Sequence, residues 1–221
     1  ITNISKIPME ISNKYKQINF LHNDISSDLY DLYKESSYIA VDTEAMGLVH
    51  GRDRLCLIQI CNELNLTSCV KIDSKTSFSN NLQKLFENEK ITKIFHYARF
   101  DVAALKCNLG INTKNIFCTK IASKLARTYT NKHGLKDLIN ELLGIELDKT
   151  SQCSDWGSDE HLTENQIDYA ANDVRYLIEA MHKLKVILKR EGRYELAKKC
   201  FSTVPVHSDL DILKFSNIFD H

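Results

Sequence analysis

Residues 37–61 read SYIAVDTEAMGLVHGRDRLCLIQIC and contain the pattern that decides the fold. The runs 37–41 and 54–61 are rich in β-branched and other apolar residues, and a stretch containing glycine and charged residues separates them. A third run, 66–72, alternates weakly between apolar and polar residues. Three such runs in close succession predict an antiparallel meander of strands.

The pattern then changes to alternating strands and helices. Residues 93–96 and 115–117 are typical of short strands, and Gly110 and Gly144 stand where helices end. Thr163–Gln166 has the composition of a capping box and predicts the start of the longest helix. The expected helices run from Asp24 or Ser26 to Tyr33, then over 78–86, 98–109, 119–126, 135–143, 163–181 and 193–200, with a surface loop over 146–162. This order predicts an α/β fold with a mixed central sheet flanked by helices.

The composition is that of an ordinary globular chain. The 221 residues are 43% hydrophobic and 26% charged, which excludes disordered, collagen-like and low-complexity proteins. No apolar run approaches the roughly 18 residues that span a bilayer, so no membrane association is expected. The 29 basic and 29 acidic residues give zero net charge. This balance argues against binding polyanions by bulk charge and leaves a local basic groove open.

Cysteine usage indicates the compartment. The seven cysteines form no CxxC pair and lie mostly in apolar runs. They predict reduced thiols in a cytoplasmic protein rather than a zinc site or a disulfide framework. The first residues, ITNISKIPMEISNKY, contain no basic segment followed by an apolar one, so no signal peptide is expected.

Acidic residues at three places could share one site. Asp42 and Glu44 directly follow the first predicted strand, and positions two apart point to one face, where two carboxylates repel each other unless a cation lies between them. Asp101 lies in the first turn of the helix after strand 93–96, and Tyr169 and Asp173 share one helix face. Each group alone also has a plain structural interpretation: carboxylates facing water, an acid complementing a helix dipole, or a tyrosine at the core edge.

The order of these motifs resembles one enzyme family. VDTEAMGLVHGRDRLCLIQIC (41–61), KIFHYARFDVAAL (93–105) and DYAANDVRYL (168–177) resemble the three exonuclease motifs of ribonuclease D, the last of the tyrosine-bearing kind. LDKTSQCSDW (147–156) is also similar to that family, and the likeness runs from about residue 15 to about residue 185. The chain is thus identified as a member of the DEDDy branch of 3′-5′ exonucleases, which implies a ribonuclease H-like fold.

The resemblance implies a catalytic set and a cofactor. Asp42 is expected to bridge two divalent cations, Mg²⁺ or Mn²⁺. Glu44 and Asp173 are expected to hold the cation that binds the attacking water, and Asp101 to serve the other. Tyr169 is expected to orient that water, because a tyrosine with a pKa near 10 is a poor base. Two such cations stabilise both the attacking and the leaving oxygen of a phosphodiester displacement.

Supporting residues are open to two interpretations. Met46 and Leu48 could wedge against the terminal base or could form a buried turn, and His96 could contact substrate or could be a packed, hydrogen-bonded core residue. Trp156 could support the loop before Tyr169 or could stack on a base. Four cationic side chains could contact phosphates or could simply be solvated: Arg52, Arg54, Arg99 and Lys120. Asp168 faces about 100° away from Tyr169 on a helix and is left out of the site.

The expected protein is a single 3′-5′ exonuclease domain over residues 1–221, with a core over about 15–190 and a short carboxyl-terminal tail. The tail is too short for the helical domains with which longer ribonuclease D proteins help to bind RNA. We expect hydrolysis of single-stranded RNA from its 3′ end to 5′-nucleoside monophosphates, with tRNA precursors as substrates and homo-oligomers as one way to extend the binding surface. Alternatives are a DNA exonuclease, an inactive nucleic-acid-binding module, and an endonuclease with a related sheet.

Overall fold

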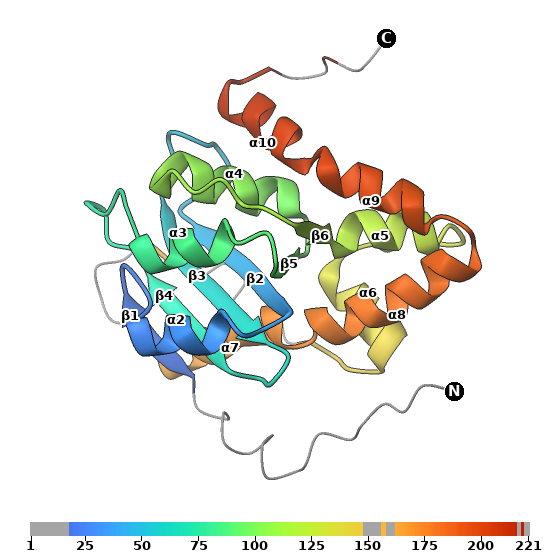
Figure 1. Cartoon of the computed structure of the whole chain (residues 1–221), viewed down its shortest axis with the longest axis horizontal. Coiled ribbons are helices and arrows are strands. Elements are labelled where there is room, and N and C mark those ends of the chain that lie inside the picture. The colour runs from blue at the N-terminus through green and yellow to red at the C-terminus, as the bar shows by residue number, and fades with distance from the viewer. Residues whose placement is uncertain (1–17, 148–155, 158–161, 216–217, 219–221) are drawn as a thin grey trace.

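A computed structural model describes residues 18–147, 156–157, 162–215 and 218. The predicted loop 146–162 and the motif at 147–156 therefore lie largely outside the described residues. A six-stranded mixed sheet forms the centre of the molecule, in the order β1-β4-β3-β2-β5-β6 (Figure 1). Its strands are β1 (Asn19–His22), β2 (Tyr38–Ala45), β3 (Leu55–Asn62), β4 (Thr67–Lys71), β5 (Thr92–Phe95) and β6 (Ile116–Cys118).

The antiparallel meander predicted from residues 37–72 is confirmed. β2 pairs with β3 and β3 pairs with β4, each antiparallel. The expectation that Asp42 and Glu44 follow the first strand was wrong, because β2 continues to Ala45 and both acids lie within it. The pairing of β2 with β3 carries the strand through the acidic residues, and the register shifts only between Glu44 and Ala45.

Parallel strands complete the sheet on both sides of the meander. β5 pairs with β2, and β6 with β5, so the carboxyl ends of these three strands meet at one edge. That edge is where α/β sheets place their sites. On the other side β1 pairs parallel to β4. β1 was not predicted, since its four residues, NFLH, are too short to show a period of their own.

Helix boundaries follow their capping residues. Ser26 caps α2 through the backbone N–H of Leu29, Gly110 ends α4 in the left-handed conformation, and Thr163 and Gln166 form the expected capping box of α7. The helix predicted over 163–181 is in fact two helices, which break at Tyr176. The described helices are α2 (Ser27–Tyr33), α3 (Asn80–Phe86), α4 (Ala98–Leu109), α5 (Thr119–Ala126), α6 (Leu135–Leu143), α7 (Glu164–Arg175), α8 (Leu177–Arg190), α9 (Tyr194–Ser202) and α10 (Val204–Ile212).

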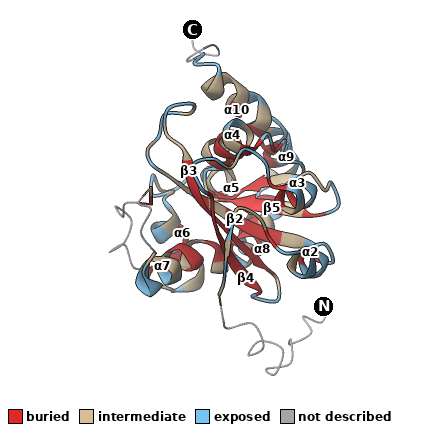
Figure 2. Cartoon of the chain, turned by 90° about the vertical axis from the view of Figure 1, so that its left-hand side faces the viewer, coloured by how far each residue is buried: buried red, intermediate tan, exposed pale blue. Residues whose placement is uncertain are grey.

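The core lies between the sheet and helices on both of its faces. α2, α3 and α4 cover one face, whereas α7 packs on β2, β3 and β4 from the other (Figures 1 and 2). α5, α6, α8 and α9 form a second group of helices beyond β5 and β6 (Figure 1). The helix α10, in a segment expected to be a tail, packs along α4. No helix in the described part of the chain is long and apolar enough to cross a membrane.

Candidate active site

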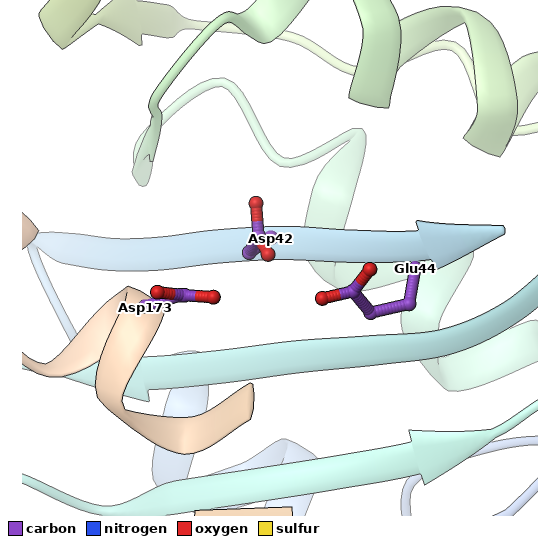
Figure 3. A group of neighbouring side chains, drawn as sticks. All are labelled: Asp42, Glu44 and Asp173. Carbon is purple, nitrogen blue, oxygen red and sulfur yellow. The ribbon is translucent and has the colours of Figure 1, made fainter. Parts of the chain in front are cut away.

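Three carboxylates from two elements meet at one place. Strand alternation puts Asp42 and Glu44 on the same face of β2, the face that α7 covers. Asp173 approaches from the last turns of α7, and the three side chains point toward a common space (Figure 3). One oxygen from each residue can be chosen so that all three lie within 4.8 Å of one another. The structure thus brings together residues that are far apart in the sequence.

Asp101 lies beside this group and has a fixed orientation. It is in the first turn of α4, as the sequence predicted, and is only 3% exposed. The hydroxyl of Thr43 donates a 2.7 Å hydrogen bond to its Oδ1. The charge of Asp101 repels those of Asp42 and Glu44, although Asp101 is not part of the 4.8 Å group.

Burial and mutual repulsion disfavour the charged form of these four acids. Burial, together with the charges of Asp101, Glu44 and Asp173, raises the pKa of Asp42 well above its usual range. Burial and the same kind of repulsion raise the pKa of Glu44 to about 8. Burial raises the pKa of Asp101 and of Asp173 to about 7. Among the described residues, no ion pair reaches any of the four.

This chemistry fits hard divalent cations. Oxygen-only donors are what Mg²⁺ and Mn²⁺ prefer, and buried carboxylates without basic partners lack the positive charge that would let them ionise together. A cation at this position would supply that charge. Asp42, Glu44 and Asp173 are the three residues whose oxygens could hold it directly.

Tyr169 lies one helical turn before Asp173 on α7, so the two share a helix face. Its half-buried ring packs against a small cluster that includes Leu57, Cys69 and Trp156. Trp156 is 5% exposed within this cluster, in line with the supporting role weighed for it. Packing thus holds the Tyr169 side chain against β3 and β4, on the helix face that also carries Asp173.

The three residues considered for substrate contact differ in their surroundings. Met46 and Leu48 lie beyond Glu44 in the connection to β3 and are 60% and 80% exposed, so they do not form a buried turn. Met46 lies against Gly157, where an added Cβ would meet its Cγ at 2.8 Å. His96 is half-buried, and its Nδ1 is 2.9 Å from the Thr119 hydroxyl. Burial lowers the pKa of His96 to about 4, so the ring is neutral at physiological pH.

A pocket with several basic side chains in its lining, called the basic pocket below, was only partly foreseen. A cavity of about 210 Å³ opens at the carboxyl ends of β5 and β6, and its polar lining comes from Tyr97, Arg99, Lys120, Lys124 and His207. Arg99 is paired with Asp211, and the Lys120 ammonium lies 4.3 Å from the centre of the Tyr97 ring. Lys124 was missed, although its position four residues after Lys120 marks one helix face. His207 comes from α10, which had no sequence signal.

The other candidate phosphate contacts are engaged elsewhere. Arg52 pairs with Asp53, and Arg54 donates to the carbonyl oxygens of Ile72 and Gly157. Arg54 therefore ties the β2–β3 connection to the segment just after Trp156. Of the four cations considered from sequence, only Arg99 and Lys120 line the basic pocket.

Comparison with known proteins places these features in context. A family model described as a 3′-5′ exonuclease matches residues 18–189. Ribonuclease D of Sphingobium indicum is 35% identical over 162 residues, which are 72% of this chain and 40% of that protein. NrnC of Brucella melitensis, solved bound to pGG, is 42% identical with a TM-score of 0.87, and the match covers 93% of this chain and 98% of that one.

The same Brucella protein has also been solved with bound Mg²⁺, and that structure is 40% identical to this chain with a TM-score of 0.87, over 93% of this chain and 99% of that one. The chain therefore spans about 40% of the length of the ribonuclease D proteins it matches and nearly all of the Brucella chain.

Proposed function

The chain belongs to the 3′-5′ exonuclease family, and from this membership and its acidic site we propose that it is a metal-dependent exoribonuclease that removes nucleotides from the 3′ end of RNA. The observation that supports this most strongly is the convergence of Asp42, Glu44 and Asp173, with oxygens within 4.8 Å, beside the buried Asp101. These are the residues in which the sequence resembles the tyrosine-bearing exonucleases.

The four acids and Tyr169 would divide the work of hydrolysis. Two divalent cations, when bound, supply positive charge on the phosphodiester and a hydroxide at near-neutral pH. Asp42, Glu44, Asp101 and Asp173 would hold those cations with their carboxylate oxygens. The Tyr169 hydroxyl would donate a hydrogen bond that orients the attacking water in line with the phosphorus. The product would be a 5′-nucleoside monophosphate.

The substrate proposal rests on the basic pocket and on the relatives. The pocket is small and lies at the same sheet edge as Asp101, so Lys120 and Lys124 would contact phosphates of the strand 5′ to the scissile bond. The pGG bound by the Brucella protein supports short or unstructured 3′ ends as substrates. Processing of tRNA precursors stays a prediction from the resemblance to ribonuclease D. A cytoplasmic location and homo-oligomer formation also stay predictions.

Replacing Tyr169 by phenylalanine tests the orienting role. We expect Tyr169→Phe to lower kcat by about 10- to 100-fold, because only the hydroxyl that aligns the attacking water is lost. Divalent cation affinity, measured by calorimetry without RNA, should stay at the wild-type value because the carboxylates are unchanged. A wild-type kcat in this variant would remove the tyrosine from the mechanism.

Replacing both pocket lysines tests the phosphate contacts. For the double variant Lys120→Gln with Lys124→Gln, we expect KM on single-stranded RNA to rise about tenfold with a smaller change in kcat. The slope of log KM against log salt should fall by roughly 1.4, since each of the two phosphate contacts on a single strand contributes about 0.7. The matched control is Lys84→Gln with Lys90→Gln, two exposed lysines near α3. Equal salt slopes in the two double variants would contradict the contact.

A time course on 5′-labelled RNA tests the proposed function. With Mg²⁺ or Mn²⁺ we expect a ladder that shortens from the 3′ end, and no cleavage in the presence of chelator. A 3′-terminal phosphate should block cleavage, whereas an endonuclease would still cut that substrate. Faster degradation of a matched DNA oligomer would instead support a DNA exonuclease, and binding without any hydrolysis would support an inactive module.

A further inference from the structure

One buried side chain near the acidic group has no hydrogen-bond partner. Gln59 lies in the middle of β3 and is 0% exposed. Within the described part of the chain, neither its amide oxygen nor its amide nitrogen is hydrogen-bonded. Buried polar groups without partners are rare in folded proteins, and each calls for an explanation such as a water or an ion.

The sheet register places Gln59 directly beside Asp42. The two residues are opposite each other in the antiparallel pair of β2 and β3, so their side chains are on the same face. On the β4 side, Gln59 is opposite Cys69, which belongs to the cluster under α7 together with Leu57, Ala170 and Ala171. The Gln59 side chain therefore lies between the sheet and α7, the helix that carries Asp173.

The energetic cost of leaving the Gln59 amide unpaired indicates that it forms a hydrogen bond in another state of the protein. An unpaired buried amide destabilises the fold, whereas an apolar side chain of the same shape at this position would be neutral or stabilising. The cross-strand neighbour Asp42 offers carboxylate oxygens on the same face of the sheet, and a charged carboxylate accepts strong hydrogen bonds.

We propose that Gln59 is a positioning residue for the metal site, whose side-chain amide N–H donates to the Asp42 carboxylate when divalent cations are bound. The inference rests on the proposed function, because it assigns a partner to the residue expected to bridge the cations. Groups that hydrogen-bond to metal-binding side chains orient them, and their loss typically weakens metal binding by 10- to 100-fold.

The variant Gln59→Met tests this proposal, because methionine keeps the length of glutamine and removes its polar atoms. Mg²⁺ and, separately, Mn²⁺ are titrated into the full chain by calorimetry without RNA. The thermal midpoint is measured in chelator. We expect cation affinity to fall about tenfold or more and the midpoint in chelator to equal or exceed that of the wild type.

Thr113→Val is the matched control. Thr113 is 3% exposed, and besides the Gln59 amide its hydroxyl is the other buried hydroxyl or amide group without a hydrogen bond among the described residues. It precedes β6, at the amino ends of the parallel strands, whereas Asp101 lies at their carboxyl ends. This variant also removes an unpaired polar group in an isosteric exchange. We expect its midpoint in chelator to equal or exceed that of the wild type, with unchanged cation affinity.

Three outcomes separate the possibilities. Wild-type cation affinity in Gln59→Met would overturn the proposal while leaving the proposed function intact. A lower thermal midpoint of Gln59→Met in chelator with unchanged cation affinity would also overturn the proposal, because the amide would then stabilise the fold and not the metal site. Absence of cation binding by the wild-type chain would instead contradict the proposed function itself, and with it this inference.

Discussion

We expect Asp42→Asn to lower kcat on single-stranded RNA by about 10³-fold or more and to leave the protein folded. The exchange keeps the volume of the side chain and removes the charge of the residue expected to bridge two cations. Cation stabilisation of the transition state contributes several kcal/mol, and each 1.4 kcal/mol corresponds to about tenfold in rate. Circular dichroism and the thermal midpoint in chelator check that the fold is retained.

Asp168→Asn is the control for this substitution. Asp168 is an exposed acid on α7 next to Tyr169, and it is not part of the acidic group. We expect its kcat to match the wild type within about twofold. A wild-type kcat in Asp42→Asn as well would contradict the proposal that the acidic group holds the catalytic cations.

The stability of the metal-free protein should depend on pH through the same acids. Their folded-state pKa values, about 7 for Asp101 and Asp173 and about 8 for Glu44, lie above the value of about 4 for carboxyls in an unfolded chain. Between these values the folded state binds more protons than the unfolded state. The stability that these groups contribute is thus fully present below pH 4 and is lost as the pH rises through 7 to 8.

A comparison with Asp173→Asn isolates this effect. In chelator, the free energy of unfolding of the variant should exceed that of the wild type by an amount that grows by roughly 2 kcal/mol between pH 5 and pH 8, since a tenfold change in proton affinity corresponds to about 1.4 kcal/mol. His96 and Lys93, whose pKa values burial lowers to about 4 and about 7, act in the opposite direction. They are present in both proteins and cancel in the difference.

Urea unfolding at several pH values measures the difference. Saturating Mg²⁺ should stabilise the wild type most at the high end of the range, because cations and protons compete for the same oxygens. A difference between the two proteins that stays constant or shrinks as the pH rises would contradict the assigned repulsion.

The elements that position the site could be predicted because each carries a local signal. Strand alternation is enough to place Asp42 and Glu44 on one face, and Gly110 and the capping box are enough to place Asp101 and Tyr169 within their helices. The ribonuclease H-like fold class expected from the motifs is confirmed by the six-stranded mixed sheet and by the structural relatives. The strand that carries Asp42 and Glu44 and the helices that carry Asp101 and Tyr169 could therefore be predicted from short stretches of sequence.

Features that depend on pairing over long distances could not be predicted. The Thr43–Asp101 hydrogen bond joins β2 to α4, and the proximity of Gln59 to Asp42 follows only from the register of β2 against β3. The break between α7 and α8 occurs at Tyr176 without a glycine or proline to mark it. The basic pocket needs α10 to pack on α4, and its Pro205 in the first helical turn gave no sign of that contact.

The position of bound metal in crystals of this chain soaked in Mn²⁺ tests directly whether the acidic group is a metal site. Anomalous scattering locates the ions independently of any assumption about activity. We expect manganese within direct coordination distance of Asp42, Glu44 and Asp173, with a second peak on the side of Asp101. Manganese bound only elsewhere, with these carboxylates free of it at saturating concentration, would contradict the account.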